Sequence, residues 1–171
     1  MIKDESGADT LPLAFVTTLL IAAIIVGIAA MGIKNVSPVI DSGSADAQAG
    51  ALTADCQALL SLAPRYLDDP GSPAGATRIV ELNLPDSTEY FALGTDPTVG
   101  QGDAGIIYYC VAGSKKAIVV DREVSFKARG DGTLSSALTS EPVVLHGGRY
   151  QLQIEYACDA AGNRYLLLGE K

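Results

Sequence analysis

The sequence predicts an α+β fold, in which one long hydrophobic N-terminal helix precedes a mostly antiparallel β-sheet head domain. Two observations predict it. The stretch 11–33 contains no ionisable side chain, and the residues after 70 form short β-rich runs separated by turns rich in Gly, Asp and Pro. A chain of 171 residues is long enough for one modest domain and an anchor.

The hydrophobic run Leu11–Ile33 predicts a membrane-spanning helix. Its 23 residues would form a helix of about 35 Å, which exceeds the roughly 30 Å of a bilayer's hydrocarbon core. Buried helices of soluble domains seldom stay apolar on every face over such a length. We therefore expect a transmembrane and packing helix over residues 8–36. Lys3 and the amino terminus precede the run and Lys34 follows it, so the positive charges at its two ends are close to a tie and do not predict its orientation.

Small residues inside this run predict close helix packing. Ala23, Gly27 and Ala30 follow one another at spacings of four and three residues. Small side chains at such spacings allow two helix backbones to approach closely in lipid or in a bundle.

Residues 37–69 are expected to form a helical continuation or neck. Ser37 and Pro38 have the residue types of an N-cap and a first helical position, and glycines near Ser42–Ser44 predict a flexible break or a bend. From Leu52 to Leu67 the apolar residues then fall on one helical face, and the run from Asp69 to Pro73 would end the helix.

The remaining residues, 70–171, are expected to form the antiparallel head. Period-two alternation and β-branched or aromatic runs predict strands there. They cover residues 80–84, 90–93, 106–111, 117–120, 123–127, 150–156 and 165–168.

The N-terminal residues and the order of elements resemble archaeal type IV pilin-like proteins. The short charged leader 1–7 ends in Gly7 and meets the apolar run, as in class III signal peptides. The resemblance implies that a prepilin-type peptidase cuts between Gly7 and Ala8. It further implies a structural subunit, major or minor, of an adhesive surface filament that assembles through the N-terminal helix. Its partners would be membrane lipid and other pilins, with the head outside the cell.

The alternative interpretation is a single-pass, membrane-anchored extracellular β-domain that binds a surface or partner and does not polymerise. Nucleic acid is not an expected partner under either interpretation. The chain carries 12 Lys and Arg against 20 Asp and Glu, a net charge of −8, whereas phosphate binding needs a net supply of cations.

The sequence predicts neither an enzyme nor a cofactor or metal site. Gly100–Gly105 fits the letters of a dinucleotide fingerprint, but a strand follows it where that motif needs a helix. Asp96 and Asp103 do not have the spacing of a calcium loop. His146, the one histidine, is expected to face solvent or cap a turn, because no nucleophile in a recognised setting accompanies it.

The three cysteines leave their pairing open. They form no C-x-x-C motif, which disfavours zinc binding and thioredoxin-like redox work. A Cys110–Cys158 disulfide across the sheet is the first expectation for a head outside the cell. A bond from Cys56 to either of them and three free thiols are the alternatives.

Overall fold

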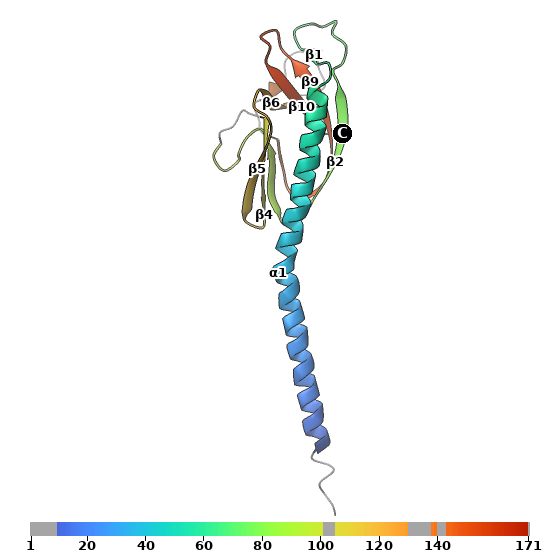
Figure 1. Cartoon of the computed structure of the whole chain (residues 1–171), viewed down its shortest axis with the longest axis vertical. Coiled ribbons are helices and arrows are strands. Elements are labelled where there is room, and N and C mark those ends of the chain that lie inside the picture. Colours follow the sequence, from blue (N-terminus) through green and yellow to red (C-terminus); the bar gives the residue numbers. More distant parts are fainter. Residues whose placement is uncertain (1–9, 101–104, 130–137, 140–142, 171) are drawn as a thin grey trace, which may run out of the picture. The chain divides into compact units, whose positions relative to one another are not determined.

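The computed structural model describes residues 10–100, 105–129, 138–139 and 143–170. It confirms the α+β class, because one long helix, α1 (Thr10–Leu60), is followed by strands in two sheets (Figure 1). The chain divides into two compact units, Met1–Val39 and Ile40–Lys171. The C-terminal part of α1 therefore belongs to the same unit as the strands.

Helix α1 is continuous, so the predicted restart at Ser37-Pro38 and the predicted break near Ser42–Ser44 are wrong. Pro38 lies inside the helix, where it removes one backbone hydrogen bond and crowds the preceding turn. Contacts with the head compensate for the poor helix formers that follow. Ser87 donates a hydrogen bond to Asp41 at 2.7 Å, and Ala45 is fully buried in the core. Tertiary packing often overrides helix propensity in this way.

The helix ends at Leu60, earlier than its predicted end near Asp69. Pro64 explains the difference, because a proline disfavours the α conformation of the residue before it. The next residues form the short strand β1 (Arg65–Tyr66), which pairs in parallel with β9 at Ala157 and Cys158.

The larger sheet has six strands. Its order is β1-β9-β10-β6-β7, and β2 also pairs with β9. The β10–β6 and β1–β9 pairs are parallel, and the other three pairs are antiparallel. The strands besides β1 are β2 (Thr77–Leu84), β6 (Val124–Arg129), β7 (Leu138–Thr139), β9 (Gly148–Cys158) and β10 (Arg164–Glu170).

The smaller sheet has four strands in the order β5-β4-β3-β8, all antiparallel. They are β3 (Thr88–Leu93), β4 (Gly105–Val111), β5 (Ser114–Asp121) and β8 (Val143–Leu145). The chain passes between the two sheets after β2, after β5, after β7 and after β8. The first and last of these passages lie so close together that a Cβ on Gly147 would come within 2.7 Å of the Asp86 backbone. Only glycine fits at that crossing.

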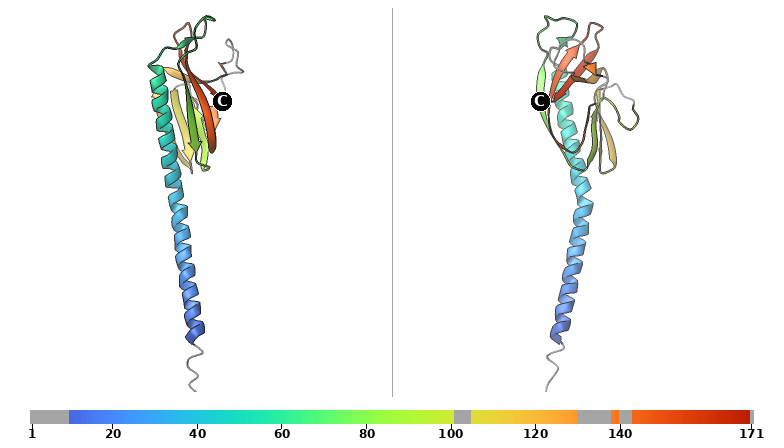
Figure 2. Two further views of the ribbon diagram at one scale, coloured as in Figure 1. Left: turned by 90° about the vertical axis from the view of Figure 1, so that its right-hand side faces the viewer. Right: turned by 180° about the vertical axis from the view of Figure 1, so that it is seen from behind.

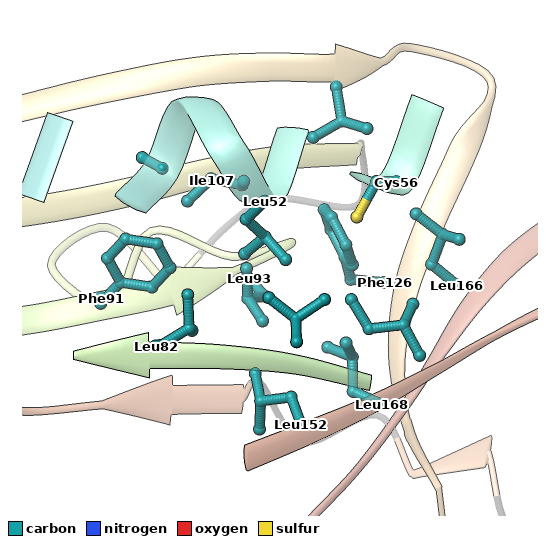
Figure 3. Packing of buried hydrophobic residues seen from close by; sticks show 14 of the residues in the cluster. Leu52, Cys56, Leu82, Phe91, Leu93, Ile107, Phe126, Leu152, Leu166 and Leu168 are labelled. Atoms are coloured by element: carbon teal, nitrogen blue, oxygen red, sulfur yellow. The ribbon is translucent and has the colours of Figure 1, made fainter. Parts of the chain in front are cut away.

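One hydrophobic core joins the two sheets to the C-terminal part of α1, which runs along one side of them (Figure 2). Figure 3 shows Leu52 and Cys56 of the helix among side chains of both sheets, such as Phe91 and Leu166. The helical residues of this core recur every three or four positions, the spacing of a single helix face. They are Ala45, Ala49, Leu52, Cys56 and Leu59, each at most 3% exposed.

Polar contacts also fix this segment of the helix against the sheets. Asp46 accepts hydrogen bonds from the Tyr109 hydroxyl at 2.8 Å and from Lys116 Nζ at 2.6 Å. One helical turn from its end, Gln57 donates to the Val120 carbonyl at 3.2 Å. Hydrogen bonds at both ends therefore set the position of the segment along the sheets.

A candidate membrane and assembly surface

The N-terminal unit contains a helix whose apolar side chains are exposed on every side. From Leu13 to Ile33 its large hydrophobic residues are 52–72% exposed. Among the described residues, α1 is the one helix long and apolar enough to cross a membrane by length and composition. A contiguous apolar surface of this size is unusual on a soluble monomer and marks a site of contact with lipid or protein.

The hydroxyl groups in this segment are satisfied within the helix. Thr17 donates to the carbonyl of Leu13 at 3.0 Å, and Thr18 donates to that of Ala14 at 2.8 Å. Because hydrocarbon offers no hydrogen-bond partner, such internal bonds lower the cost of placing these polar side chains in a bilayer.

The three predicted packing residues all lie on this exposed helix. Ala23, Gly27 and Ala30 are exposed, and a Cβ built at Gly27 would meet no atom within 4 Å. Their own chain therefore gives no steric reason for their small size.

A second small-residue face lies on the part of α1 that belongs to the head, and the sequence interpretation missed it. Most of the residues exposed on this part of the helix are Gly or Ala, where a solvated helix face usually carries charged side chains. The small exposed residues are Gly43, Ala47, Gly50, Ala51, Ala54 and Ala58, and the other exposed residues are Ile40 and Gln57. The spacing of three and four residues between the small ones was a signal available in the sequence.

The predicted cleavage site, Gly7 and Ala8, lies outside the described residues. So does Asp103, together with most of the glycine-rich run 100–105. Strand β4 begins at Gly105, in agreement with the expectation that a strand follows this run.

The structure does not join the cysteines. All three are free thiols, and Cys110 and Cys158 lie on strands of different sheets, β4 and β9. Burial raises the pKa of Cys56 to about 12, and burial also raises the pKa of Cys110. Cys158 is partly exposed.

The remaining polar candidates have local structural roles. His146 is exposed at the passage between β8 and β9, with Nδ1 2.6 Å from the Glu89 carbonyl oxygen. Asp96 accepts hydrogen bonds from the backbone N–H and the hydroxyl of Thr98, which lower its pKa. Within the described ranges, no three His, Cys, Asp or Glu residues come together as metal ligands could.

Comparisons with family models, with curated proteins and with solved structures found no match to this chain.

Proposed function

We propose that this chain is a structural subunit, major or minor, of an archaeal type IV pilus-like filament on the cell surface. The exposed apolar helix would anchor the subunit in the membrane and then pack against the same helix of neighbouring subunits. The head would form the outer shell of the filament and contribute to adhesion. The observation that carries this proposal is the uncovered apolar surface from Leu13 to Ile33.

The burial of apolar surface favours the helix both in lipid and in a filament. Removing apolar surface from water is favourable by about 25 cal/mol per Å². Lipid can cover this surface before assembly. In a filament, neighbouring helices would cover it by close packing, for which Ala23, Gly27 and Ala30 leave room.

The glycines on the helical part of the head support helix packing beyond the bilayer. Glycine in a helix costs about 1 kcal/mol relative to alanine. A Cβ at Gly43 or Gly50 would meet no atom within 4 Å of its own chain, so internal packing does not require either glycine. The close approach of a neighbouring helix would require a residue without a side chain at these two positions.

The charge of the chain fits an exposed filament subunit. A net charge of −8 would keep filaments soluble and mutually repelling. Before assembly, a prepilin-type peptidase would remove residues 1–7 and leave Ala8 as the N-terminus.

The second candidate is a single-pass anchored β-domain that binds a surface or partner without polymerising. The length of the apolar run favours this candidate, because a single bilayer is thick enough to cover the run without any neighbouring subunit. Mass spectrometry of the membrane-bound chain separates the two: an N-terminus at Ala8 supports the filament subunit, and an intact Met1 supports the anchored domain.

Substitutions at the small residues test assembly directly. Gly27→Leu and Gly50→Leu should each abolish incorporation into surface filaments, because the added side chain would occupy the space of a neighbouring helix. Neither should reduce the amount of chain in the membrane fraction. Val26→Leu, which adds one methylene beside Gly27, is the matched control and should leave filaments intact. Normal filaments in both glycine variants would contradict the proposal.

A further inference from the structure

A groove with several polar side chains along it lies on the outer face of the six-stranded sheet, where β2 pairs with β9. Its volume is about 420 Å³, and it is lined by Glu81, Leu82, Asn83, Arg149, Tyr150 and Gln151. This volume lies within the range of small-molecule sites, about 300–1,000 Å³. Leu82 is buried in the hydrophobic core, and successive strand residues face opposite sides. The exposed side chains at 81, 83, 149 and 151 therefore form the walls of the groove.

The register of the two strands brings four different polar groups together. Glu81 lies opposite Gln151, and Asn83 lies opposite Arg149. Gln151 Nε2 donates a long hydrogen bond of 3.4 Å to Glu81 Oε1. Arg149 forms no ion pair with any carboxylate in the described part of the chain. Its five N–H donors are thus available to a ligand.

These groups favour a neutral, polyhydroxylated ligand. One carboxylate and one guanidinium give the groove no net charge, although the chain as a whole is strongly acidic. Planar carboxylate, amide and guanidinium groups present paired donors or acceptors, which match adjacent hydroxyl groups on a sugar ring. Ile79, on the same face of β2 and 47% exposed, offers an apolar contact for the C–H side of such a ring.

We propose that this groove binds a neutral saccharide. The binding site lies entirely on two strands of the head and needs neither membrane insertion nor polymerisation. The head would bind the saccharide whether the chain acts as a filament subunit or as an anchored domain.

The experiment measures saccharide binding to the full chain in lipid nanodiscs by isothermal titration calorimetry. The probes are maltotriose and triacetylchitotriose as neutral oligosaccharides and trigalacturonic acid as an acidic one. At least one neutral probe should bind, and it should bind more tightly than the acidic probe. Binding of the acidic probe alone, or of none of the three, would overturn the proposal.

Variants locate the binding. Asn83→Ala and Arg149→Gln should each weaken binding of the neutral probe about tenfold, the loss expected from one or two hydrogen bonds. Arg122→Gln, at an exposed position in the turn between β5 and β6, should leave the affinity unchanged. Both groove residues are exposed, so the thermal unfolding midpoint should stay the same in all three variants. Equal affinity of the groove variants and the control would show that the sugar binds elsewhere.

Discussion

In the hairpin between β4 and β5, the non-glycine residue Ala112 has a left-handed backbone conformation. Ala112 has a φ of 49° and Gly113 a φ of 80°, so both residues of this two-residue turn are left-handed. Such turns match the twist of antiparallel strands and favour Asn-Gly. A non-glycine residue in this conformation costs about 1–2 kcal/mol, and Ala112 has no polar side chain to offset the cost.

Substitutions at Ala112 should therefore change stability in opposite directions. Ala112→Asn should raise the free energy of unfolding by about 0.5 kcal/mol, because Asn tolerates this conformation best after Gly. Ala112→Val should lower it by about 1 kcal/mol, since a β-branched residue fits positive φ poorly. Urea unfolding of the two variants in detergent measures both changes in the free energy of unfolding. A lower stability for the Asn variant than for the Val variant would contradict the assigned turn.

The thiols provide a second test at the residue scale. A pKa of about 12 for Cys56 means that almost none of this thiol is ionised at pH 8, and only the thiolate reacts rapidly. Iodoacetamide at pH 8 should therefore label Cys158 in the folded protein and leave Cys56 and Cys110 unlabelled. After unfolding without a reductant, mass spectrometry should find three labels. A single label after unfolding would reveal a disulfide.

At the scale of elements, the position of α1 on the head depends on one buried stripe and a few polar contacts. The contact of Asp46 with Tyr109 and Lys116 joins the helix to the four-stranded sheet. Hydrogen bonding to Lys116 lowers the pKa of Asp46, so its contribution to stability is present above the unfolded pKa and is lost as the pH falls through the folded value.

Tyr109 shows the opposite pH dependence. Burial, with the hydrogen bond to Asp46, raises its pKa from 10.0 to about 12, so its contribution is complete below pH 10 and is lost as the pH rises through about 12. Tyr109→Phe should lower the free energy of unfolding by about 1 kcal/mol at pH 7. The difference from the wild type should shrink between pH 10 and 12. Tyr66→Phe, at an exposed position, should have no effect; a constant difference across this range for Tyr109→Phe would contradict the assignment.

Most elements of the fold could be predicted from local sequence patterns. The seven predicted strands all occur, as β2, β3, β4, β5, β6, β9 and β10, because alternating or continuous apolar runs mark one buried face. The two-residue strands β1 and β7 are too short to show a period. The unbroken helix through Pro38 depends on contacts with residues far along the chain, such as Ser87, which no local pattern contains.

At the scale of the whole molecule, the candidate surface was only partly predictable. The apolar run itself identifies the exposed helix of the N-terminal unit. The spacing of the small residues on the helical part of the head is visible in the sequence, but the structure was needed to show that they lie on the side opposite the buried Leu52 and Cys56. The groove on β2 and β9 also required the structure, because the register of these strands joins residues about 70 positions apart.

The central claim is that the apolar surface of α1 is covered by lipid or by other copies of the chain. Sedimentation of the full chain of 17.7 kDa, prepared from cells without detergent, tests this claim most directly. We expect the chain only in membrane vesicles or in filaments that pellet rapidly, and no species at the mass of one subunit. A stable, water-soluble monomer of that mass would contradict the account.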